Sequence, residues 1–148
     1  MEGSLGRLQG LGIAALRWIV GLVFLVHGSQ KLFVFHIAGT AGFFGKIGIP
    51  LPEVSAVVVT LVEFLGGAAL ILGIGTRVAA VLLAINMLGA IYFVHGRNGF
   101  MLPTGYEYAL TLLVANVSLA LSGAGMCALD NLISRTRHPR AASSPAVA

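Results

Sequence analysis

An apolar run from Val54 to Leu72 carries a single charged residue, Glu63, and no other feature restricts the possible folds of this chain as much. A run of this length can cross a bilayer as an α-helix, which needs about 20 apolar residues. A helix is also the only open-ended element that satisfies its own backbone hydrogen bonds in lipid. We therefore expect membrane-spanning helices, one of which holds a carboxylate at bilayer depth, where it needs a partner or a function.

The composition excludes a soluble globular protein. Of 148 residues, 57% are hydrophobic and 9% are charged, which leaves too little polar surface to coat a soluble domain. The net charge of +4 does not indicate nucleic-acid binding, because the basic residues are scattered along the chain. The single cysteine, Cys127, excludes an internal disulfide and a CxxC redox pair. No metal site is expected.

Four apolar runs predict an all-α membrane protein, a bundle of four transmembrane helices in a single domain that covers residues 1–133. A short cytoplasmic tail, residues 134–148, is rich in Arg, Pro, Ser and Ala and is expected to be flexible. The four helices are expected at about residues 11–33, 52–72, 77–94 and 106–121.

The charges predict the orientation. Arg7, Arg77 and the arginines of the tail fall on one side of the predicted bundle, so both termini should be cytoplasmic. The first connection, Val34 to Pro50, is apolar and rich in glycine. It is expected to lie in the headgroup boundary or to fold back over the bundle as a lid.

A short pattern recurs in the two halves of the sequence. Val26-His27-Gly28 ends the first predicted helix and Val94-His95-Gly96 ends the third. This repetition predicts two duplicated helical hairpins, with His27 and His95 approaching the same outer face. Chance similarity is the alternative, because such matches arise easily in so apolar a sequence.

Arg17 and Glu63 are the first candidates for a site. Their predicted depths differ by about 7 Å, at 1.5 Å per residue, which the long arginine side chain can span. The pair could position or charge a redox ligand. The favoured interpretation is a structural clasp that keeps two charges out of lipid.

His27, Gln30 and Lys31 follow the helical spacing i, i+3 and i+4, so they share one face of the first helix. With His95 and Glu107 nearby, this face could hold a quinone head group, with a carboxylate handling the proton. The alternative is that Lys31 extends to the lipid headgroups and His27 bonds a backbone carbonyl. Haem held by His27 and His95 is less favoured, because His95 is expected near the membrane surface.

Small residues crowd the second predicted helix, at Gly66, Gly67, Ala68, Ala69 and Gly73. Such a face lets helix backbones approach closely in lipid. It could pack within the chain or against a partner helix, including one from a second copy in a homo-oligomer.

Several motifs follow one another along the chain: Arg17, Val26-His27-Gly28 with Lys31, Glu63-x-x-Gly66-Gly67, Leu72-Gly73-x-x-Thr76-Arg77, and the closing segment Gly123 to Asp130. In order and spacing these motifs resemble the DoxX family of small bacterial membrane proteins, and the resemblance extends from about Gly12 to Asn131. The chain has Ala124 and Ala128 where the family usually has proline and serine, which affects only the terminal turn.

The resemblance implies an integral protein of the bacterial plasma membrane, embedded in the lipid bilayer. Family members include a subunit of an archaeal thiosulfate:quinone oxidoreductase and a mycobacterial partner of superoxide dismutase and a thiosulfate sulfurtransferase. It therefore suggests a membrane subunit that links a soluble redox partner of this kind to the quinone pool. His27, Lys31 and Glu63 would be the ligand-binding or proton-handling residues, and Arg77 matches a further family position.

Two other functions stay open. One is a non-enzymatic scaffold that recruits redox-defence proteins to the membrane, and the other is a transporter of protons or small solutes. Whether the chain is an enzyme by itself also stays open, because fold analogy does not assign chemistry.

Overall fold

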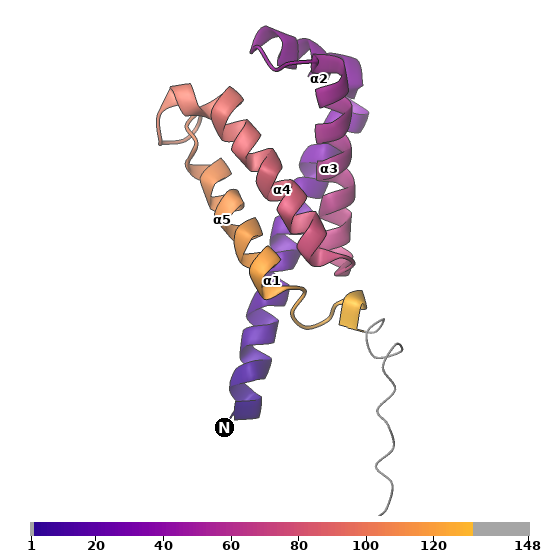
Figure 1. Ribbon diagram of the computed structural model, residues 1–148, viewed down its shortest axis with the longest axis vertical. Coiled ribbons are helices and arrows are strands. Elements are labelled where there is room, and N and C mark those ends of the chain that lie inside the picture. The colour runs from indigo at the N-terminus through magenta and orange to yellow at the C-terminus, as the bar shows by residue number, and fades with distance from the viewer. Residues whose placement is uncertain (1, 132–148) are drawn as a thin grey trace, which may run out of the picture.

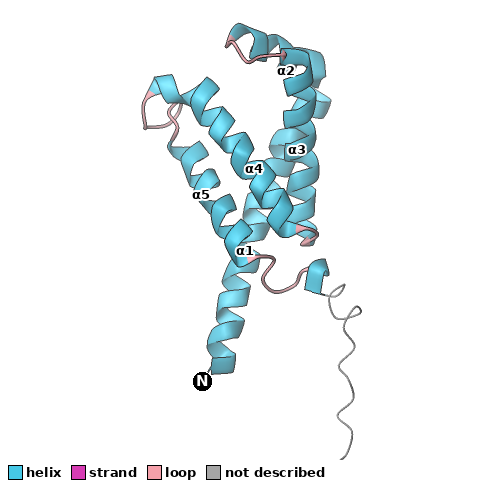
Figure 2. Cartoon of the chain, in the orientation of Figure 1, coloured by secondary structure: helices cyan, strands magenta, loops and turns pink. Residues whose placement is uncertain are grey.

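The computed structural model describes residues 2–131, and most of these residues are helical (Figures 1 and 2). Within this range there is no strand. The all-helical class predicted from the sequence is therefore confirmed. The predicted tail, residues 134–148, lies outside the described residues, as do residues 1, 132 and 133 of the predicted domain.

The described part of the chain contains five α-helices and three shorter helical turns. The π-helical turns η1 and η2 extend α1 and α4, and the 3-10 turn η3 follows η2. In chain order the elements are α1 (Glu2–Ser29), η1 (Gln30–Val34), α2 (His36–Lys46), α3 (Pro52–Leu72), α4 (Thr76–Ala90), η2 (Ile91–His95), η3 (Gly96–Asn98) and α5 (Glu107–Ser122).

Three of these segments are long and apolar enough to cross a membrane, namely residues 3–34, 52–72 and 76–98. The fourth apolar helix, α5, has 16 residues. At 1.5 Å per residue it is about 24 Å long, which is shorter than the hydrocarbon core of about 30 Å. Large apolar side chains such as Leu22, Leu65 and Ile85 are exposed on the helices, which fits a lipid environment.

Glycines bring α1 and α3 into backbone contact. A β-carbon on Gly67 would lie 2.4 Å from the backbone nitrogen of Leu25, and one on Gly28 would lie 2.4 Å from that of Phe64. These distances leave room only for hydrogen, so the glycines allow the two helix backbones to touch where residues 21–28 of α1 meet residues 64–71 of α3. Gly66 faces α4 instead, where a β-carbon would lie 3.2 Å from the Leu83 side chain. Gly66 and Gly67 therefore pack within the chain.

Arg17 holds α1 against the end of α3 and the segment after α5, and in Figure 1 the N-terminal half of α1 continues below this level. We call this level the lower end of the helix bundle. The Arg17 side chain is fully buried and donates hydrogen bonds to five carbonyl oxygens. Arginine suits this position because its planar fork offers five N–H donors. The acceptors belong to the end of α3 and to the segment after α5, and they are the carbonyl oxygens of Leu70, Ile71 (2.9 Å), Ala124 (3.0 Å), Met126 (3.3 Å) and Cys127 (3.0 Å).

Asp130 completes this lower end. Its carboxylate accepts hydrogen bonds from the backbone N–H groups of Gly75 (2.9 Å) and Thr76 (3.2 Å), which begin α4. A carboxylate at a helix N-terminus satisfies free N–H groups and favours the helix dipole. The closing segment predicted from the sequence is thus held against the turn between α3 and α4.

The helices form two pairs that separate toward the upper end of Figure 1. There α4 and α5 diverge from α1 and α3, and α2 lies above α3 (Figures 1 and 2). Buried residues from both pairs form one core, which includes Val20, Phe24, Leu83 and Leu119. A smaller cluster of Ala41, Phe44 and Ala56 holds α2 on α3. The divergence places a cavity between the two pairs.

Candidate functional site

A cavity of about 920 Å³ lies between the two helix pairs, in the upper half of the molecule. All five α-helices contribute to its wall, which is mostly aromatic and aliphatic; Phe24, Phe44, Met87, Phe93 and Tyr108 are among the lining residues. Its volume falls in the range of small-molecule binding sites, which are typically apolar clefts with a few well-placed polar groups. The cavity is therefore the candidate site.

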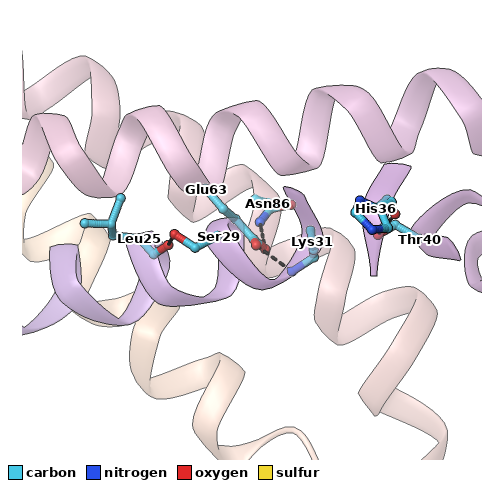
Figure 3. Close-up of polar contacts among 7 residues, drawn as sticks. All are labelled: Leu25, Ser29, Lys31, His36, Thr40, Glu63 and Asn86. Carbon is cyan, nitrogen blue, oxygen red and sulfur yellow. Dashed lines mark hydrogen bonds and ion pairs between the residues drawn. The ribbon is translucent and has the colours of Figure 1, made fainter. Parts of the chain in front are cut away.

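A cluster of three polar side chains forms one part of the cavity wall. Lys31 forms an ion pair with Glu63, in which Nζ donates a hydrogen bond to Oε2 at 2.5 Å. Asn86 Nδ2 donates a hydrogen bond to the other carboxylate oxygen, Oε1, at 2.9 Å. Figure 3 shows Lys31 and Asn86 meeting the Glu63 carboxylate. The side chain of Glu63 is 6% exposed and that of Lys31 is 19% exposed. The carboxylate is thus buried, paired with a cation and bonded by an amide, as a charge at this depth requires.

The predicted pairing of Arg17 with Glu63 is wrong. Arg17 lies level with Leu70 and Ile71, whose carbonyls it bonds, and these residues follow Glu63 by two turns of α3. Seven residues correspond to about 10 Å along the helix. Lys31 is the cation that reaches the carboxylate instead. The clasp interpretation holds for Arg17 itself, but its partners are carbonyl oxygens.

Arg77 does not belong to this charge cluster either. It is exposed in the first turn of α4, nine residues before Asn86. That separation is about 13 Å along the helix. Arg77 lies beside Gly123 at the lower end, where a β-carbon on that glycine would come within 3.3 Å of the guanidinium.

Four of the five residues predicted to bind a cofactor line the cavity: His27, Gln30, Lys31 and His95. His27 and Gln30 are exposed at its edge. His95 is held by a 3.0 Å hydrogen bond between Nδ1 and the carbonyl oxygen of Thr104.

Glu107 is turned to the connection between η3 and α5, where its carboxylate accepts a 2.9 Å hydrogen bond from the backbone nitrogen of Leu102. Unlike Glu107, both His27 and His95 line the cavity, which thus contains residues of the Val26-His27-Gly28 and the Val94-His95-Gly96 patterns.

Asn86 is the residue of the cluster that the sequence interpretation did not place with Glu63. A second asparagine, Asn116, is buried but does not reach the cluster, and it donates to the Leu112 carbonyl of its own helix. The contact between Glu63 and Asn86 could have been predicted from the sequence, because α3 and α4 are joined by a tight turn at Ile74. Glu63 lies 11 residues before Ile74 and Asn86 lies 12 residues after it. Residues at equal distances from the turn of a helical hairpin reach the same depth.

Residues 12–96 match the model of the DoxX family. The chain belongs to the DoxX family. The matched residues include Arg17 and the whole Lys31–Glu63–Asn86 cluster, whereas the closing segment held by Arg17 lies beyond them.

Relatives of this DoxX protein extend over nearly its full length. A Bacillus subtilis protein named "Putative oxidoreductase CatD" is 37% identical over 123 residues, which are 83% of this chain and 87% of that protein. A membrane protein of Mycobacterium tuberculosis is 36% identical over 83% of this chain and 82% of its own length. The Escherichia coli inner membrane protein YqjF is 28% identical over 87% of this chain and 97% of its own length. No solved structure matches the chain.

Proposed function

We propose that this DoxX-family membrane protein is the membrane subunit of a redox complex and links a soluble oxidoreductase partner to the quinone pool. The proposal depends on one observation, the mostly apolar cavity whose wall carries the Lys31–Glu63–Asn86 cluster. It is supported by the name of the Bacillus subtilis relative, which describes an oxidoreductase.

The cavity residues fit a quinone. Its flat ring suits the aromatic wall, and its carbonyl oxygens need hydrogen-bond donors. Lys31 has three N–H donors, of which one is directed to Glu63, and the amide of Asn86 has a second N–H. Both side chains can therefore donate to a carbonyl oxygen while they keep their bonds to the carboxylate. When bound, the quinone supplies the redox chemistry by carrying electrons between the partner and the pool.

The residues around the ring have distinct tasks. Lys31 donates a charge-assisted hydrogen bond to a carbonyl oxygen of the quinone, and the ion pair with Glu63 fixes the position of the ammonium group. His27 precedes Lys31 by four residues and lines the same cavity, so it can exchange a proton between the cavity edge and its interior. Glu63 and His27 are thus the proposed proton-handling groups.

Binding of a quinone to the purified protein in lipid nanodiscs tests the proposal. Lys31→Met should weaken binding by roughly one to two orders of magnitude, because a hydrogen bond to a charged donor contributes about 1.5–3 kcal/mol and each 1.4 kcal/mol is about tenfold. Lys46→Met is the matched control, since Lys46 is exposed at the end of α2 and does not line the cavity. An unchanged affinity of the Lys31 variant, or an equal loss in the control, would count against the assigned role.

A second candidate is the non-enzymatic scaffold, and one observation favours it. Lys31 and Asn86 both donate to Glu63, so the cluster can serve to join η1, α3 and α4 without any ligand. Under this function a soluble redox partner co-purifies with the chain, but no quinone-dependent activity accompanies it. Glu63→Gln would then lower the stability of the bundle and leave partner recruitment intact at low temperature.

We also propose that α5 is a fourth, short span and that both termini are cytoplasmic in a bacterial inner membrane. The Escherichia coli relative is named an inner membrane protein. Arg7, Arg77 and Cys127 then share the cytoplasmic side. Cys127 is free and exposed, so a membrane-impermeant maleimide should label it only after spheroplasts are lysed. Labelling of intact spheroplasts would reverse the proposed orientation.

A further inference from the structure

The cavity has an edge at bilayer depth. Val58, Leu82 and Ile85 line it and are also 52%, 47% and 60% exposed, so these side chains mark an opening. Val58 lies six residues inside the upper end of α3, and Leu82 six residues inside the lower end of α4. Both are therefore about 9 Å from a helix end, at 1.5 Å per residue. We call this opening the α3–α4 window.

Another part of the cavity edge, on α1 and η1, is polar. There α1 and η1 present His27 and Gln30, which are exposed and polar. An apolar chain that leaves the cavity would keep its contacts with lipid at the α3–α4 window, whereas at the other edge it would cover polar groups that need hydrogen bonds.

The polar cluster lies within reach of the window. Asn86 directly follows Ile85, and Glu63 follows Val58 by five residues on α3. A head group bonded by Lys31 and Asn86 is thus in the cavity to which the window leads, and along their helices Glu63 and Asn86 lie within about 8 Å of Val58 and Ile85. Glu63 is also the twelfth of 21 residues in α3, so the cluster lies at mid-helix, away from the membrane surface.

From these positions we propose that the ligand is a quinone with a long hydrocarbon tail, which enters sideways from the bilayer through the α3–α4 window. Its head group binds at the Lys31–Glu63–Asn86 cluster and its tail stays in the window and the surrounding lipid. This inference rests on the proposed function and adds the class of quinone and its route. A ligand dissolved in the bilayer reaches a mid-helix cluster without crossing the polar edge of the cavity.

A tryptophan placed in the window tests the route. Ile85→Trp should narrow the opening and weaken the binding of a decyl-tailed benzoquinone roughly tenfold, the loss expected when about two methylene groups lose their contacts. The same benzoquinone without a tail fits inside the cavity and should bind the variant as it binds the unaltered protein. Both affinities are measured with the full chain in nanodiscs.

Leu88→Trp is the matched control, because Leu88 is 54% exposed on the same helix and does not line the cavity. Leu82→Trp provides a second window variant in case the first disturbs the fold, which circular dichroism and gel filtration would reveal. Both window variants should weaken the binding of the decyl-tailed benzoquinone only. The control should leave the affinity for both quinones unchanged.

Two results would overturn the inference in different ways. If the unaltered protein binds both quinones and the window variants leave the two affinities unchanged, or lower them equally, the tail does not use this window and the proposed function survives. If the unaltered protein binds neither quinone, the proposed function fails and the inference fails with it.

Discussion

Replacing Lys31 by methionine tests the ion pair on which the candidate site depends. Glu63 would keep its hydrogen bond from Asn86 but lose its cation, while only 6% of its side chain is exposed. Removing one partner of a buried pair costs about 3–5 kcal/mol. One feature reduces this figure: the Lys31 side chain is 19% exposed, so the ion pair is only partly buried. We expect a loss of about 2–3 kcal/mol in the free energy of unfolding.

A double-mutant cycle separates the pair from other effects of the substitution. Glu63→Gln alone should cost less, about 1–2 kcal/mol, because the partly exposed ammonium of Lys31 can turn toward water. The double substitution should cost less than the sum of the two single ones by at least about 1 kcal/mol. Unfolding by graded SDS in mixed micelles measures all three variants. Additive losses would refute the pair, and Lys46→Met should leave stability unchanged.

Three further predictions concern packing and the lower end. Gly67→Ala should destabilise the bundle by about 1–3 kcal/mol, because its methyl group would meet the backbone of α1, whereas Gly89→Ala has open space and should be neutral in the same SDS assay. Arg17→Lys should lower the thermal midpoint strongly, since an ammonium cannot bond five carbonyls, and the exposed Arg77→Lys should not; equal effects would contradict the clasp. Asp130→Ala should cost about 1 kcal/mol through loss of the α4 cap, and an unchanged midpoint would argue against it.

The sequence predicted helix bounds well where turn residues mark them. The bounds of α3 agree with the prediction, because Pro52 occupies the first turn and Gly73 ends the helix with φ of 69°. The start of α1 at Glu2 was missed, since Gly3, Gly6 and Gly10 precede the apolar run and favour a coil.

Tertiary contacts explain the other missed helix. The connection from Val34 to Pro50 contains glycines that argue against helix, yet α2 forms there. Ala41 and Phe44 on α2 bury their side chains against Ala56 of α3, and this packing outweighs the weak intrinsic preference. The sequence left two positions open for this segment, the headgroup boundary or a fold back over the bundle, and α2 packs on α3 and lines the upper cavity.

The sequence selected residues that line the cavity but did not predict how they pair. His27, Lys31 and Glu63 were chosen as candidate site residues, and all three line the cavity; their role there stays a prediction. Their pairing depends on the offset between α1 and α3, which the close contact of Gly67 with α1 determines. The partners of Arg17 could not be predicted, because they are backbone carbonyls and every residue type carries one.

Arg17 has a consequence for biogenesis. Its guanidinium bonds carbonyls that are 53 and 54 positions away and others that are 107 to 110 positions away. At bacterial translation speeds, roughly 5–20 s separate the synthesis of Arg17 from that of its last acceptors. During that interval the guanidinium lacks three of its five acceptors, and an unpaired charge is costly in lipid. Arg17 can therefore be fully paired in its buried position only after the segment through Cys127 has been synthesised.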